Sequence, residues 1–153
     1  MNYLQWNLDL EEGIDIFDPL GNLKIIGDEG NIVEDSTYLD AFFEALVEAA
    51  QKIKTETNIS VDPIVEPNNL EFNCKKDTIK INYGQQQATI FDKNKFIKDV
   101  REAVSELLKI LDEQSQQTKQ PKRKLIKLRN FIEDNKLTPS IATNLTRTYR
   151  DRT

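Results

Sequence analysis

Two long segments of the chain carry apolar residues at helical spacing, and each follows a stretch in which apolar and polar residues alternate. The first segment runs from Thr37 to about Lys54 and the second from Lys93 to about Glu113. An amphipathic helix must bury its apolar stripe against another layer, and alternating strands offer one apolar face. The sequence therefore predicts an α+β protein in which two helices cover β-strands.

The region before the first helix predicts a β-hairpin. Residues 13–18 and 23–26 alternate in polarity, and a turn containing proline and glycine separates them. A short third strand is expected at residues 32–33. Asp35 or Ser36 then follows as the cap of the helix, because either side chain can accept a hydrogen bond from the first helical amides.

The region between the two helices predicts a second set of strands. Residues 59–67 include two prolines, which cannot donate to a sheet ladder, so this stretch is expected to be an edge strand or an extended connection. Asp92 is expected to cap the second helix. The three strands predicted in between span residues 70–74, 78–83 and 88–91.

Sliding the sequence against itself by 58 residues places apolar positions of the first half over apolar positions of the second. This agreement predicts two tandem β-β-β-α units, at about residues 13–56 and 70–113, that share one antiparallel sheet with both helices on one face. Two unrelated amphipathic units of similar length are the alternative, because periodicity alone produces part of the agreement. The aligned pairs are Ile14/Phe72, Ile16/Cys74, Leu23/Ile81, Ile25/Tyr83, Ile32/Ile90, Tyr38/Phe96, Phe42/Val100, Ala45/Ala103, Leu46/Val104, Ala50/Leu108 and Ile53/Leu111.

Charge and composition divide the chain into three parts. We expect an acidic α+β domain at residues 1–113, a polar linker at 114–121 and a basic helical tail at 122–153. Residues 1–118 carry 11 basic and 23 acidic groups, whereas residues 119–153 carry 10 basic and 3 acidic groups. The tail is expected to contain a helix that ends near Asn135 and a second short helix from Pro139 to about Arg150.

The composition argues against several kinds of active site. The chain has no histidine, so zinc chemistry and a Ser-His or Cys-His pair are excluded, and the lone Cys74 allows no disulfide within the chain. No phosphate-binding loop or EF-hand pattern is present. We therefore expect no enzyme, no metal site and no cofactor. An enzyme would depend on carboxylate, lysine or tyrosine groups converging in a cleft.

The expected location is the cytoplasm, with no membrane partner. No run approaches the roughly 20 apolar residues that cross a bilayer, and the first residues lack the pattern of a signal peptide.

These exclusions favour a non-catalytic protein–protein interaction module, such as an immunity or inhibitor-like protein or an assembly subunit. It would bind a protein partner through an acidic surface or the open sheet face, and a second copy of the chain is a further candidate partner. Trp6 stands in an alternating stretch that is a candidate for an additional strand, and tryptophan is frequent in binding hot spots. The candidate partner-binding residues are Trp6, Asp28, Glu29, Lys122, Arg123, Lys124, Leu125, Leu128 and Ile132.

A regulatory nucleic-acid-binding protein is the alternative hypothesis. Its contact element would be the two basic helices of the tail, whose Lys and Arg residues could bind phosphates. The acidic body argues against this function, because it would repel a duplex. An apolar stripe on the first tail helix, formed by Leu125, Leu128 and Ile132, would instead suit docking on a protein.

Overall fold

The computed structural model describes residues 2–11 and 13–136. Within this part the protein is α+β, with three helices and two antiparallel sheets of three and four strands. The strands are β1 (Leu4–Leu8), β2 (Leu20–Ile26), β3 (Asn31–Tyr38), β4 (Asn58–Val61), β5 (Leu70–Lys75), β6 (Thr78–Tyr83) and β7 (Gln86–Ile90). The helices are α1 (Leu39–Lys52), α2 (Lys93–Thr118) and α3 (Ile126–Lys136).

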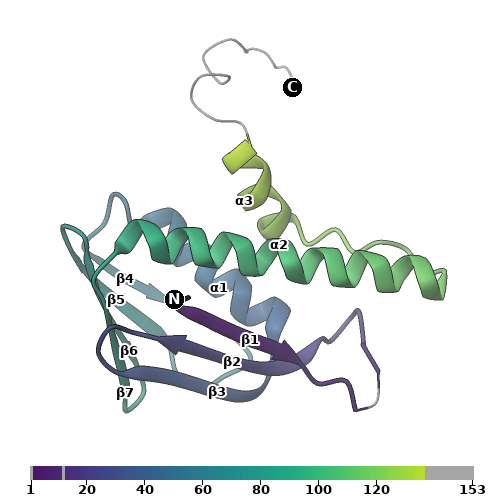
Figure 1. Ribbon diagram of the computed structural model, residues 1–153, viewed down its shortest axis with the longest axis horizontal. Coiled ribbons are helices and arrows are strands. Elements are labelled where there is room, and N and C mark those ends of the chain that lie inside the picture. The colour runs from purple at the N-terminus through teal and green to yellow at the C-terminus, as the bar shows by residue number, and fades with distance from the viewer. Residues whose placement is uncertain (1, 12, 137–153) are drawn as a thin grey trace, which may run out of the picture.

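The elements form layers (Figure 1). α1 and α2 lie together on one side of the strands, and α3 packs on both of these helices, farther from the sheets. α1 contacts β2, β3 and β4 and therefore touches both sheets. One hydrophobic core fills the space between the strands and these two helices.

The expectation of one shared sheet is not confirmed, because the strands form two separate sheets ordered β1-β2-β3 and β4-β5-β6-β7. The edges of β3 and β7 face each other, and a single bridge joins Glu29 to Thr89. The Gln86 side chain accepts from the Val33 amide at 2.8 Å and donates to the Val33 carbonyl at 3.1 Å. A side chain thus satisfies main-chain groups that a continuous ladder would have paired with a strand.

Two tyrosines strengthen this seam between the sheets. The Tyr83 hydroxyl on β6 donates to the Glu34 carboxylate on β3. The Tyr3 hydroxyl donates to Asp28 Oδ2 at 2.8 Å, and the same oxygen accepts from the Phe91 amide at 2.7 Å. Burial, followed by the hydrogen bond to Asp28, raises the pKa of Tyr3 to about 12. Burial and the bond to Glu34 likewise raise the pKa of Tyr83.

The predicted hairpin is wrong in its first strand. Residues 13–18 form a connection without strand structure, and β2 pairs instead with β1, the stretch that contains Trp6. The Asp15 side chain accepts from the amides of Phe17 and Asp18, a local bond that competes with sheet pairing. Ile16 is nevertheless buried, so the alternation marked burial rather than a strand.

The predicted cap of the first helix is also wrong. β3 continues through Asp35 and Ser36, because Thr37 and Tyr38 still pair with β2, and α1 begins at Leu39 without a side-chain cap. At the second helix the prediction is confirmed, since the Asp92 side chain accepts from the Lys95 amide at 3.0 Å.

The remaining elements of the second half follow the sequence closely, and β4 is an edge strand as expected. α2, however, continues to Thr118, so residues 114–118 of the expected linker are helical. Their Gln, Ser and Thr residues do not break a helix, and Ser115 is buried. The helix ends at Lys119, which adopts the left-handed conformation typical of a C-terminal cap.

Most aligned pairs of the proposed repeat lie at equivalent buried places. Leu23 and Ile81 are buried in β2 and β6, and Leu46 and Val104 are buried in α1 and α2. Two kinds of position depart from the pattern. Ile14 and Ile16 lie outside any strand, and Tyr38 is exposed whereas Phe96 is buried.

The raised pKa values of Tyr3 and Tyr83 predict that the native and unfolded chains ionise their tyrosines differently at alkaline pH. Folding stabilises the protonated form of Tyr3 and Tyr83, so this contribution is complete below pH 10 and is lost as the pH rises through their raised pKa values. At about pH 11 the native chain should carry two fewer tyrosinates than the chain in guanidinium chloride. Absorbance at the tyrosinate band, followed against pH, measures this difference. Coincident titration curves for the native and denatured chains would contradict the buried, hydrogen-bonded state of Tyr3 and Tyr83 in the seam.

Candidate functional site

The connection between β1 and β2 forms a fixed surface at one end of the molecule. Its ends are tied by the Asp9 amide, which donates to the Leu20 carbonyl at 2.9 Å, and by the Pro19 carbonyl, which accepts from the Leu39 amide at 2.9 Å. In the middle, Arg123 Nη1 donates to the Ile16 carbonyl at 2.8 Å. The connection is therefore held to the start of α1 and to the segment before α3.

A hollow of about 430 Å³ opens between this connection and the end of β3. The carboxylates of Asp9, Asp15 and Asp18 line it together with the ring of Tyr38. Tyr38 is 42% exposed, although the sequence placed it on the buried stripe of the first helix. Its neighbours in the lining are Leu8, Gly13, Ile14, Pro19 and Leu20.

Large apolar side chains are exposed on the connection and on the loop after β4. Phe17 is 53% exposed on the connection itself, and Ile64 is 78% exposed on the loop after β4. This loop is linked to β3 by the Thr37 hydroxyl, which donates to Glu66 at 2.7 Å. Ile64 has a φ of 72°, a left-handed conformation that is costly for a β-branched residue. We call residues 9–11 and 13–19, Tyr38 and residues 62–66 the acidic end.

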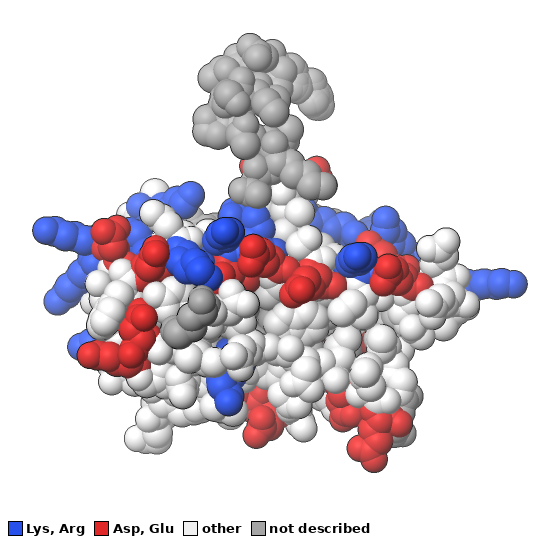
Figure 2. Space-filling view, viewed as in Figure 1, with Lys and Arg blue, Asp and Glu red and all other residues white. Residues whose placement is uncertain are grey.

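The carboxylates of the acidic end are not neutralised by bases of the described chain. Five ion pairs occur within residues 2–11 and 13–136, and they use the carboxylates of Asp40, Glu48, Asp99 and Asp112. In Figure 2 a mixed band of positive and negative side chains runs over α2. A purely acidic group stands at the lower right, where Figure 1 places the β1–β2 connection.

The structure does not gather the sequence-predicted partner residues into one site. Trp6 lies on β1, partly buried, with its ring 5.5 Å from that of Phe43 in an edge-on arrangement. Asp28 and Glu29 are exposed at the β2–β3 turn, where both take part in the seam. The other candidates lie on or before α3.

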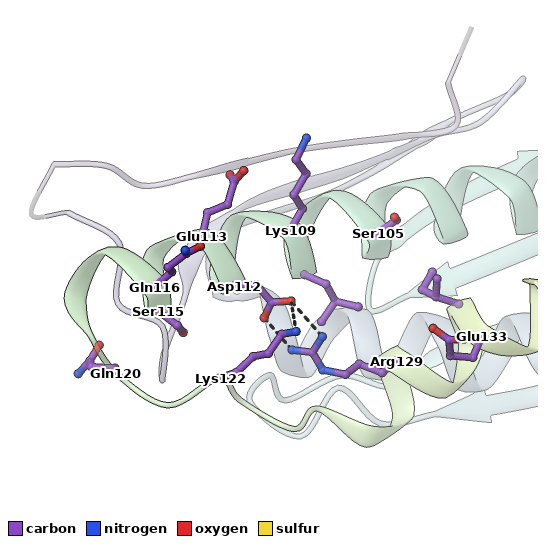
Figure 3. A pocket seen from close by; sticks show the side chains of 12 residues that line it. Ser105, Lys109, Asp112, Glu113, Ser115, Gln116, Gln120, Lys122, Arg129 and Glu133 are labelled. Carbon is purple, nitrogen blue, oxygen red and sulfur yellow. Dashed lines mark hydrogen bonds and ion pairs between the residues drawn. The ribbon is translucent and has the colours of Figure 1, made fainter. Parts of the chain in front are cut away.

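The basic residues before and within α3 bind their own body. Arg123 Nη1 lies 3.0 Å from Asp40 Oδ2, and Arg129 makes a two-pronged contact with Asp112 at 2.8 and 3.1 Å. Lys122 reaches the same carboxylate at 3.7 Å (Figure 3). Lys124 is exposed. Three of the expected phosphate or partner contacts are thus engaged within the chain.

The apolar stripe of the tail also faces inward. Leu125 and Leu128 are buried, and Ile132 is partly buried against the core. Phe131, which the sequence set beside this stripe, is buried under the guanidinium of Arg101 at 4.6 Å from the ring centroid. Desolvation at this place lowers the pKa of Arg101. The expected second tail helix, residues 139–150, lies outside the described residues.

The sequence did not predict that Phe17, Ile64 and Tyr38 are exposed. A weak signal was present at Ile64 and Val65, which are apolar residues in a connection between two prolines, where no strand could bury them. Tyr38 gave no such signal, because its helical spacing matched a buried position.

In the described part of the chain, no group of three or more Asp, Glu or Cys side chains is arranged to hold a metal ion. None of the described helices combines the length and apolar character needed to cross a membrane. No protein-family model, no curated protein and no solved structure matches this chain significantly. Function must therefore be argued from the surface itself.

The inward packing of α3 predicts that this helix contributes to the stability of the whole body. Leu128→Ala removes a fully buried side chain and should lower the free energy of unfolding by about 2–5 kcal/mol. Ile126→Ala on the same helix is the control, because Ile126 is 62% exposed and should change stability by less than about 0.5 kcal/mol. Urea denaturation monitored by circular dichroism measures both. Equal, small effects would mean that α3 is not part of the folded body.

Proposed function

We propose that this protein is a non-catalytic protein-interaction module whose acidic end docks on a basic surface of a partner protein. The observation that carries the proposal is the hollow lined by Asp9, Asp15, Asp18 and Tyr38. Tyr38 is exposed there, as is Phe17 on the same connection, and aromatic side chains are enriched in binding interfaces. Carboxylates inside such a patch favour a cationic partner group.

A lysine or arginine of the partner fits the chemistry of the hollow. Its charge would meet the carboxylates of Asp9, Asp15 and Asp18, and the ring of Tyr38 would offer a cation–π contact. Phe17, exposed on the same connection, would add apolar contact area to the interface. Residues 1–118, with a formal net charge of −12, would attract a basic partner over longer distances.

The class of module follows from the same chemistry. An immunity or inhibitor-like protein that covers a basic enzyme, or an assembly subunit, would use such a surface. We place this activity in the cytoplasm, a reducing compartment that suits a chain with one buried, unpaired cysteine. The structural β-β-β-α repeat stays part of the proposal, since buried positions of β2, β3 and α1 align with those of β6, β7 and α2.

The experiment compares two double variants of the full chain that lose the same charge. Asp15→Asn with Asp18→Asn neutralises the hollow, and the asparagine at position 15 can still accept the local amide bonds. Glu71→Gln with Asp77→Asn neutralises exposed carboxylates on the other sheet. Each protein is used to capture partners from nuclease-treated lysate of the source cells, and the affinity for the recovered protein is then measured by calorimetry.

The hollow variant should bind the recovered partner at least about tenfold more weakly, and the control should bind like the wild type. Equal losses in both variants would mean that net charge alone drives the association. Recovery of nucleic acid without nuclease treatment, and of nothing with it, would favour the alternative function.

A further inference from the structure

β1 is an edge strand, so alternate residues along it have main-chain groups without a partner strand. The Ile26 amide donates to the Tyr3 carbonyl at 2.7 Å, and the Asp9 amide donates to the Leu20 carbonyl at 2.9 Å. Because bonded positions alternate along an antiparallel ladder, the odd-numbered residues of β1 bond to β2. The N–H and C=O groups of Leu4, Trp6 and Leu8 therefore point away from β2. Leu4 is buried beside α2, so the groups at the free edge are those of Trp6 and Leu8.

A groove of about 350 Å³ runs beside these residues. Leu4 and Trp6 form its strand side, and residues of α2 form the other side, including Glu102, Ala103 and Glu106. α2 lies next to β1 in Figure 1, and the two elements are in contact. A binding channel with an open strand edge on one side and a helix on the other suits an extended peptide.

The charges of the groove indicate which peptide fits. Glu102 and Glu106 lie one turn apart on α2, both exposed, and neither takes part in the five ion pairs of the described chain. Asp99 is different, because its carboxylate is buried and already accepts from Lys95 and from the Tyr3 amide. Lys109 adds one positive charge to the helical side, so Glu102 and Glu106 leave this side with a net negative charge that favours lysine or arginine in the bound segment.

We propose that an extended, basic segment of a partner protein adds to the free edge of β1 and lies in the groove between β1 and α2. Its main chain pairs with Trp6 and Leu8, and its basic side chains meet Glu102 and Glu106. The five residues of β1 match a segment of similar length. Trp6 contributes the aromatic wall, which is partly exposed although its ring packs on Phe43. This surface adjoins the acidic end at Leu8, which also lines the hollow, but its carboxylates are those of α2 and not those of the β1–β2 connection.

The test begins with a phage library of random linear 12-residue peptides, panned on the full chain. The enriched peptides are synthesised and titrated while the fluorescence of Trp6, the single tryptophan of the chain, is followed. Enrichment of sequences with lysine or arginine at alternate positions is expected. A library that yields no enriched binder would overturn the proposal.

Two measurements then locate the bound peptide. Glu102→Gln with Glu106→Gln should weaken binding about tenfold, whereas Glu71→Gln with Glu113→Gln, an equal loss of charge outside the groove, should not. In amide hydrogen exchange, the peptide should slow Trp6 and Leu8 and leave Gln5 and Asn7 unchanged, since those two already bond to β2. Equal weakening by both variants, or no selective slowing, would refute strand addition.

The outcome is independent of the proposed function. Asp15→Asn with Asp18→Asn should leave peptide binding unchanged, so loss of partner docking at the acidic end and loss of the groove are distinguishable. If the amides of Trp6 and Leu8 exchange slowly without peptide, in a manner that depends on protein concentration, a second copy of the chain occupies the edge and the assignment to a partner segment is wrong.

Discussion

A single core under two helices holds the two sheets together, and the rest of the structure depends on it. The helix α1 packs Phe43 against Trp6 of the first sheet and Phe42 against Tyr83 of the second. α2 adds Phe96, whose ring faces Phe72 of the second sheet. Small sheets of three or four strands with one apolar face need such a cover to be stable. The hydrogen bonds of the seam then set how the sheets meet, with side chains in place of a continuous ladder.

The same arrangement decides which charges remain available. The guanidinium groups of Arg123 and Arg129 bind other parts of the same chain. Arg123 holds the β1–β2 connection to α1, and Arg129 holds α3 to α2. The carboxylates of the acidic end have no comparable partner within the described ion pairs. Paired and unpaired charged side chains are therefore unevenly distributed over the surface, which the net charge does not reveal. Arg123 and Arg129 of a basic segment that looked free to bind phosphate stabilise the fold instead, whereas the carboxylates of the acidic end remain outside the ion pairs.

Both candidate surfaces arise where the fold leaves interactions incomplete. At the acidic end, side chains are left exposed because the connection runs outside the sheet. At β1, main-chain groups are left unpaired because the strand lies at an edge. The first surface suits recognition of a cationic side chain, and the second suits recognition of an extended backbone. Neither surface depends on a cofactor, a metal or a titrating histidine, which this chain does not contain.

The sequence by itself determined the class of the fold, the two long helices and most of the strands, because hydrophobic periodicity is a local property of the chain. It also predicted the cap at Asp92 and the burial of Leu23, Ile81, Leu46 and Val104. It did not determine that Ile16 is buried without a strand, or that Tyr38 is exposed at a helical spacing. Only the tertiary structure decided these points, together with the seam at Gln86, the inward packing of Arg123 and Arg129, and the open edge of β1. Each depends on which distant segments meet, and one-dimensional patterns carry no information on the partners that satisfy a side chain or a main-chain group.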